Sequence, residues 1–142
     1  MRNYKKEIKI VLFVCLALCL SSCTNKGPSN EEICGIWKNK EAGSFTFKKD
    51  HTFSGINLKS GIFLFQPQNP SKSFSGEGTW KLQKGDASWE IELYFSSYSD
   101  GNDKILYHLP VSGEKGILEN QPPWYLFVWK DEEGGERIIF DK

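Results

Sequence analysis

The chain has 142 residues, 18 of them basic and 18 acidic, so its formal net charge at neutral pH is zero. A nucleic-acid-binding protein would need a clustered basic surface, which this balanced composition does not suggest. The 14% aromatic content supplies large apolar side chains for a core or for a binding surface.

The first 22 residues have the pattern of a secretory signal peptide. A basic opening, from Arg2 to Lys9, precedes an unbroken apolar run from Ile10 to Leu20. These segments correspond to the n-region and h-region of such a signal. The apolar run is about half the ~20 residues that a membrane-spanning helix needs.

The apolar run ends in Leu20-Ser21-Ser22-Cys23, a leucine and two small residues followed by cysteine. This tetrad resembles the lipobox of bacterial lipoproteins, in which the cysteine sulfur is acylated and the cysteine becomes the new N-terminus. The resemblance implies that Cys23 anchors the chain to a membrane of the cell envelope. Thr24 is not the aspartate that commonly retains enterobacterial lipoproteins at the inner membrane, so we expect the outer membrane, facing periplasm or exterior. An ordinary signal peptide or a short buried helix is the alternative.

Cleavage before Cys23 changes the composition of the mature chain. Residues 1–22 hold four basic residues and one acid, so 14 basic and 17 acidic residues are left, a net charge near minus three. Cys34 is then the one cysteine outside the signal and the lipidation site. An unpaired cysteine in an oxidising compartment is either buried or forms an intermolecular bridge, and the apolar strand start beside Cys34 favours burial.

Residues 23–32 are expected to form the lipidated cysteine and a flexible tether. The segment is small, polar and charged around Gly27 and Pro28, and the nine residues after the cysteine reach at most ~30 Å when fully extended. The folded domain is then expected over residues 33–142, which is a common size for a single domain.

Short segments rich in aromatic and β-branched residues recur between turn signals in this domain, which predicts an all-β fold. The expected strands are Gly35–Asn39, Ser44–Lys49, Thr52–Leu58, Gly61–Gln66, Phe74–Gln83, Ser88–Phe95, Ile105–Val111, Trp124–Lys130 and Glu136–Phe140. Between Trp89 and Phe95, apolar and polar residues alternate, so one face of that strand is expected to be buried and the other wet.

Consecutive strands of this length form an up-and-down barrel or a β-sandwich. Gly35-Ile36-Trp37 on the first strand resembles the Gly-x-Trp signature of lipocalins and related calycin barrels, and Gly78-Thr79-Trp80 repeats it. With the lipobox, the chain resembles small lipocalin-like bacterial lipoproteins. The resemblance implies a barrel of about eight strands, with Trp37 closing one end beneath Arg137 from the last strand.

Motifs for catalysis or metal binding are missing from the sequence. It contains no His-Glu-x-x-His, Gly-x-Ser-x-Gly, P-loop or Cys-x-x-Cys pattern. His51 is expected to be a solvated turn residue and His108 a hydrogen-bonded wall residue. Residues 100–103 resemble only the start of a calcium loop, and the acidic residues of 131–136 are expected to form a solvated loop. We therefore expect no catalytic residue, no metal and no cofactor.

The segment from Trp124 to Trp129 is apolar on both faces of its strand. Either Trp124, Leu126 and Val128 or the alternate residues Tyr125, Phe127 and Trp129 must face outward, where they need cover or a partner. In the structural interpretation, the loop near residues 67–73 or the end of the tether covers these outward side chains. The functional interpretation is an aromatic surface for a partner protein or a glycan.

The sequence favours a monomeric, non-enzymatic binding lipoprotein over an enzyme. One version carries or senses a small apolar molecule inside the barrel, against Trp80 or Trp89. The other binds a protein through Tyr125, Phe127 and Trp129, as an envelope inhibitor or immunity-type protein does. The interior of an eight-stranded barrel either is filled by its own side chains or holds one small ligand. The high aromatic content favours an interior filled by side chains.

Overall fold

The structure is a computed structural model of the whole chain, and it describes residues 27–64, 67, 69–99, 104–115, 120–130 and 135–142. The predicted signal peptide and Cys23 therefore lie outside the described residues.

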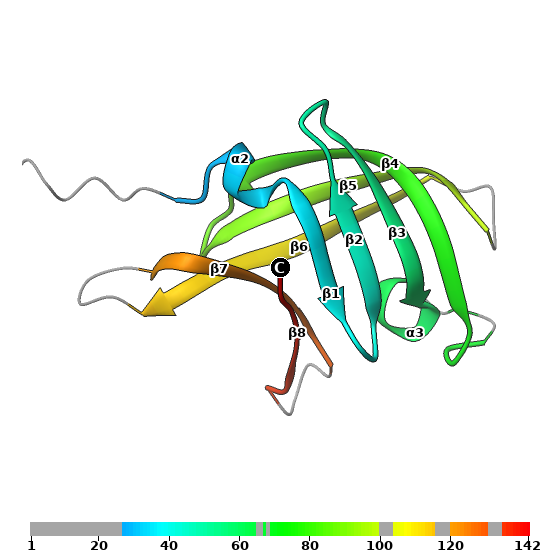
Figure 1. Cartoon of the computed structure of the whole chain (residues 1–142). Coiled ribbons are helices and arrows are strands. Elements are labelled where there is room, and N and C mark those ends of the chain that lie inside the picture. Colours follow the sequence, from blue (N-terminus) through cyan, green and yellow to red (C-terminus); the bar gives the residue numbers. More distant parts are fainter. Residues whose placement is uncertain (1–26, 65–66, 68, 100–103, 116–119, 131–134) are drawn as a thin grey trace, which may run out of the picture.

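Eight antiparallel strands follow one another around a nearly closed barrel (Figure 1). They are β1 (Gly35–Asn39), β2 (Gly43–Phe47), β3 (Thr52–Lys59), β4 (Ser73–Lys84), β5 (Trp89–Tyr98), β6 (Ile105–Lys115), β7 (Asn120–Trp129) and β8 (Arg137–Phe140). Each strand pairs with its neighbours in sequence. Between β1 and β8, Lys38 and Asp141 exchange two backbone hydrogen bonds, with N–O distances of 2.7 and 3.0 Å. The predicted all-β, up-and-down barrel is confirmed, and the sandwich alternative is set aside.

The two faces of the sheet differ in polarity as the alternation predicts. On β5, Ile91, Leu93 and Phe95 are at most 2% exposed, whereas Tyr94 between them is 48% exposed. The side chains of a strand point alternately to opposite faces, so the first group fills the barrel and the second faces solvent.

The predicted strand Gly61–Gln66 is wrong over its described part. Residues 60–63 form the single-turn helix α3 (Ser60–Phe63), closed by a hydrogen bond from the Leu64 N–H to the Ser60 carbonyl of 2.9 Å. Phe63 is 3% exposed and packs against Phe45 and Phe140 in the barrel. Burial of this ring at the end of the barrel favours the helical turn, although the local sequence resembles a strand.

Within the tether predicted over residues 23–32, the described residues 27–32 make contact with the barrel and begin a short helix. Gly27 lies so close to the Trp89 ring that a Cβ there would overlap it, and Pro28 is buried. The helix α2 (Asn30–Ile33) follows, capped at Ser29. Its last residue, Ile33, is fully buried, so the packed part of the chain includes residues from Gly27 onward.

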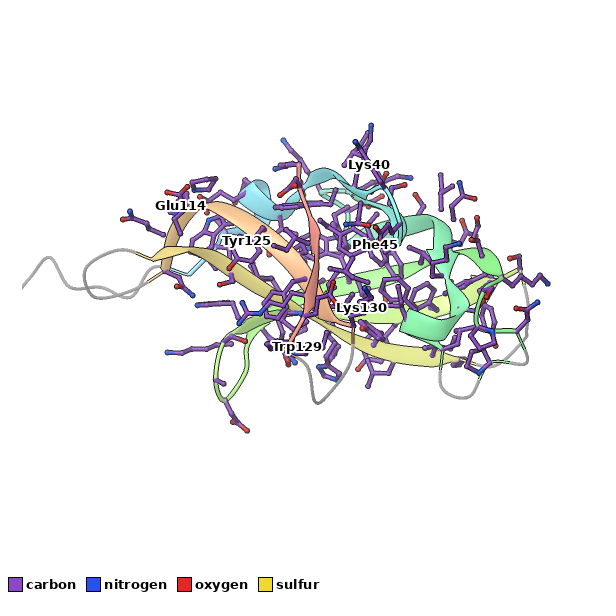
Figure 2. The ribbon with its side chains drawn as sticks, turned by 90° about the horizontal axis from the view of Figure 1, so that it is seen from below. Lys40, Phe45, Glu114, Tyr125, Trp129 and Lys130 are labelled. Atoms are coloured by element: carbon purple, nitrogen blue, oxygen red, sulfur yellow. The ribbon has the colours of Figure 1, made fainter. Side chains whose placement is uncertain are left out.

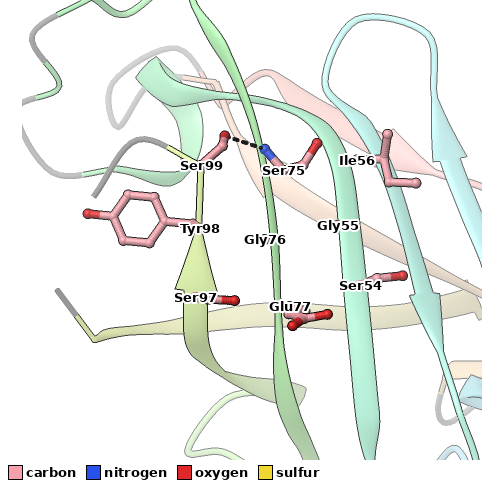
Figure 3. Close-up of a pocket in the computed structure, with 9 residues that line it drawn as sticks. All are labelled: Ser54, Gly55, Ile56, Ser75, Gly76, Glu77, Ser97, Tyr98 and Ser99. Carbon is pink, nitrogen blue, oxygen red and sulfur yellow. Dashed lines mark hydrogen bonds between the residues drawn. The ribbon is translucent and has the colours of Figure 1, made fainter. Parts of the chain in front are cut away.

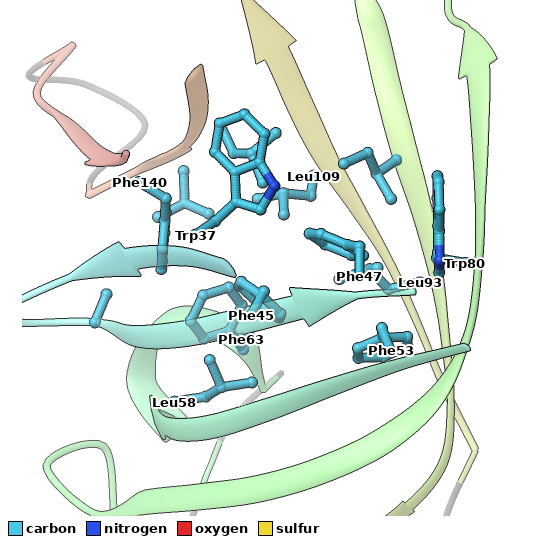
Figure 4. Packing of buried hydrophobic residues seen from close by; sticks show 14 of the residues in the cluster. Trp37, Phe45, Phe47, Phe53, Leu58, Phe63, Trp80, Leu93, Leu109 and Phe140 are labelled. Atoms are coloured by element: carbon cyan, nitrogen blue, oxygen red, sulfur yellow. The ribbon is translucent and has the colours of Figure 1, made fainter. Parts of the chain in front are cut away.

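Large side chains from all eight strands meet inside the barrel (Figure 4). The Phe45 ring centroid lies 5.8 Å from that of Phe47 and 5.5 Å from that of Phe140, and the centroids of Phe53 and Phe95 are 4.9 Å apart in an edge-on arrangement. These are the separations of directly packed rings. The aromatic residues therefore occupy the middle of the barrel.

Candidate functional site

Trp80, one of the two candidate ligand-binding tryptophans, is packed into the core. Its ring is 2% exposed and lies 5.4 Å from Phe47 and 5.0 Å from His51, measured between centroids. The indole N–H donates to the Lys48 carbonyl oxygen at 3.0 Å. Trp80 therefore fills the barrel and fixes the turn between β2 and β3, and His51 is a turn residue that packs on this ring.

Trp89, the second candidate, lies at the rim of the barrel beside α2. It is half-buried and, with Val111, Asn120 and Trp124, lines a hollow of about 320 Å³. Gly27 lies against the Trp89 ring, so the N-terminal segment covers part of this hollow.

The indole N–H of Trp124 is buried in this region without a hydrogen-bond partner among the described residues. The pKa of the nearby Glu32 carboxyl is lowered, first by the backbone N–H of Ser29, which donates to it at 2.8 Å. The Trp124 N–H lies near enough to contribute to the lowered pKa of Glu32, without reaching hydrogen-bonding geometry.

Tyr125, Phe127 and Trp129 all face outward on β7, where they form an aromatic ladder. The centroids of Tyr125 and Phe127 are 6.2 Å apart, and those of Phe127 and Trp129 are 5.5 Å apart. Leu126 and Val128 point into the barrel instead and are at most 1% exposed. Figure 2 shows Tyr125 and Trp129 along β7.

Arg137 on β8 lies across this aromatic ladder. Its guanidinium carbon is 4.7 Å from the Phe127 ring centroid and 4.5 Å from that of Trp129. Trp129 and Arg137 are register partners on the two strands, which places their side chains on the same outer face. Phe127 is only 7% exposed, whereas Trp129 is 48% and the adjacent Ile139 41% exposed. The ladder is therefore covered at its centre and open at Trp129.

The predicted pairing of Arg137 with Trp37 is wrong. Trp37 is 1% exposed inside the barrel, whereas Arg137 faces outward. The Nζ of Lys142 lies 5.4 Å from the Trp37 ring centroid instead, and the Trp37 indole N–H donates to the Ile33 carbonyl at 2.7 Å. Closure at Trp37 thus involves α2 and Lys142.

A second hollow of about 400 Å³ lies on the outer face of β3, β4 and β5 (Figure 3). Most of its lining residues are serines and glycines, and a Cβ at Gly55 or Gly76 would collide with Leu58 or Phe95. The Ser75 N–H donates to the Ser99 hydroxyl oxygen at 3.1 Å across its edge. The one charged side chain that the described residues place in this open, serine-lined surface is that of Glu77.

The remaining titratable candidates do not assemble a reactive site. His108 is exposed and its Nδ1 lies 3.1 Å from a carboxylate oxygen of Glu90. A hydrogen bond from Gln83 and the contact with His108 lower the pKa of Glu90. Cys34 is a free, half-buried cysteine. The candidate calcium loop at 100–103 and the acidic residues 131–133 lie outside the described residues, and the part of the chain that is described contains no group of three potential metal ligands.

Comparisons with protein families, with curated proteins and with solved structures each return no match to this chain. Among the described residues, no helix is long and apolar enough to cross a membrane.

Sequence reasoning missed α2, which determines how the N-terminal segment joins the barrel. Its signal is present as Ser29-x-x-Glu32, the spacing of a capping box, directly before the apolar Ile33.

Proposed function

We propose that this protein is a membrane-anchored, non-enzymatic binding lipoprotein that recognises a partner protein through the aromatic ladder. One observation carries the proposal: Trp129 is half-exposed and stacked on Arg137, beside the exposed Ile139. Tryptophan, tyrosine and arginine contribute most to binding at protein interfaces. Stacking also orders the guanidinium before a partner arrives, which lowers the entropy lost on binding.

The carrier version has less support. Inward positions such as Trp80 are occupied by rings packed on one another, and an eight-stranded barrel filled in this way has no room for a ligand. The hollow between Trp89 and Trp124 is the best site left for a small apolar molecule, and the N-terminal segment already covers part of it.

A photoreactive tryptophan analogue that keeps the indole ring, placed at position 129 in the lipidated protein, would test the aromatic ladder in intact cells. Position 94 is a matched control, because Tyr94 and Trp129 are each 48% exposed on the outer surface. We expect one adduct of discrete mass from position 129, lost with Arg137→Ala, and none from position 94.

Equal adducts from both positions, or none from position 129, would contradict the partner-binding function. The carrier version would be supported by saturable one-to-one uptake of a fatty-acid-like probe that Trp80→Ala or Trp89→Ala abolishes and Trp129→Ala leaves unchanged.

A further inference from the structure

The N-terminal segment is held to one end of the barrel by several independent contacts. Gly27 lies on the Trp89 ring, and Ile33 is fully buried in the core. The Lys142 ammonium donates to the Glu32 carbonyl at 2.7 Å, and Ser29 and Glu32 cap each other across α2. Because Ile33 belongs to the core, this segment cannot detach from the barrel end without exposing apolar surface.

The strand directions place α2 and the aromatic ladder's exposed end at opposite ends of the barrel. β1 starts beside α2, so β7, which runs parallel to it in the alternating order, also starts at that end. Trp129 is the last residue of β7, about 30 Å along the strand from Asn120. Arg137 begins β8 and lies beside it.

Only three residues, Thr24, Asn25 and Lys26, separate Cys23 from Gly27. Even when fully extended, the chain from Cys23 to Gly27 spans at most about 14 Å, which is less than half of the roughly 30 Å that separate Asn120 from Trp129 along β7. If Cys23 carries a lipid, this short connection keeps the α2 end of the barrel close to the bilayer. The Trp129 end then points away from the bilayer.

We propose that the α2 end of the barrel rests against the membrane surface. Trp129 and Arg137 are then displayed at the opposite end, toward the aqueous compartment that the protein faces. This inference rests on the lipidation of Cys23 in the proposed function. The orientation adds that the partner protein approaches from the aqueous compartment and not from within the membrane.

The test uses the acylated protein reconstituted in phosphatidylcholine vesicles that contain a headgroup spin-labelled quencher lipid. In a Cys34→Ser background, a fluorophore is attached at Asp86→Cys, Lys40→Cys or Ile139→Cys, one site at a time. Asp86 is exposed in the turn at the α2 end, Lys40 is exposed in the turn at the opposite end, and Ile139 is on the outer side of the barrel.

We expect severalfold stronger quenching at position 86 than at positions 40 and 139. A twenty-residue Gly-Ser insertion after Lys26 adds a flexible reach of roughly 25 Å and should abolish this difference. Equal quenching at all three positions in the protein of natural length would overturn the inference. Strongest quenching at position 139 would overturn it too, since the barrel would then lie on its aromatic side.

The mass of the purified protein separates the two proposals. If Cys23 is not acylated, the anchoring part of the proposed function fails and the orientation falls with it. If Cys23 is acylated but position 86 is not preferentially quenched, the orientation alone is wrong.

Discussion

At the residue scale, Trp80 decides whether the barrel is filled or hollow. Its ring is 2% exposed and its N–H donates to the Lys48 carbonyl, so truncation should leave a void and remove one of the hydrogen bonds to that carbonyl. We expect Trp80→Ala to lower the free energy of unfolding by about 3–5 kcal/mol, measured by urea denaturation. Trp129→Ala is the control and should lower it by no more than about 1 kcal/mol. Similar losses for the two variants would show that Trp80 is not packed as described.

The stacking of Arg137 on Trp129 is a second property of single residues. Cation–π pairs at exposed sites contribute about 0.5–1 kcal/mol, and a double-mutant cycle with Arg137→Ala and Trp129→Ala should give a coupling of that size. Arg137→Lys should recover part of it, because lysine cannot lay a planar guanidinium on the ring.

A double-mutant cycle with Arg137→Ala and Trp37→Phe provides the control. The two losses of unfolding free energy should add, because these side chains lie on opposite faces of the sheet. Coupling in the Trp37 cycle together with additivity in the Trp129 cycle would show that Arg137 interacts with Trp37 and not with Trp129.

At the scale of elements, the short helix α2 depends on its capping box. The Glu32 N–H donates to the Ser29 hydroxyl at 3.3 Å, and the Ser29 N–H donates to the Glu32 carboxylate at 2.8 Å. Ser29→Ala should therefore lower the free energy of unfolding by about 1 kcal/mol. No loss in chemical denaturation would show that α2 adds nothing to the stability of the barrel.

The same cap makes stability depend on pH. Because the folded-state pKa of Glu32 is lowered from its usual 4.5, the cap stabilises the fold above that value, and this contribution is lost as the pH falls through the folded-state pKa. Between pH 6 and 3, the unfolding free energy of Glu32→Gln should fall less steeply than that of the wild type. Some slope should persist, because the pKa values of Asp50 and Glu90 are lowered as well. Identical slopes in the two proteins would rule out a linked proton at Glu32.

At the scale of the whole molecule, the proposed lipid anchor and the barrel should be separable. Cys23 precedes Gly27, the first described residue, by four positions, so Cys23→Ala should block acylation without changing the barrel. We expect this variant to leave the membrane fraction while its thermal unfolding, measured on the folded domain, is unchanged. A processed, lipid-modified form of Cys23→Ala would contradict the lipobox assignment.

Local patterns predicted the barrel well and its closure poorly. The alternation between Trp89 and Phe95 predicts which side chains point inward, because a strand's period is two whatever its surroundings. The strand expected at Gly61–Gln66 fails for the opposite reason, since Phe63 is drawn into the core by residues distant in sequence. The spacing of Ser29 and Glu32 indicates the start of a capped helix, but the polar composition of the segment favoured a flexible tether.

The sequence by itself determined the all-β class and the succession of hairpin strands, because alternation and turn chemistry are local. Only the tertiary structure decided which face of β7 points outward and which cation lies on which ring. Arg137 lies on Trp129 because register pairs them across β7 and β8, and Lys142 lies over Trp37 because the barrel brings the chain's last residue beside its first strand. Such contacts depend on pairing and closure between distant segments, which no local pattern encodes.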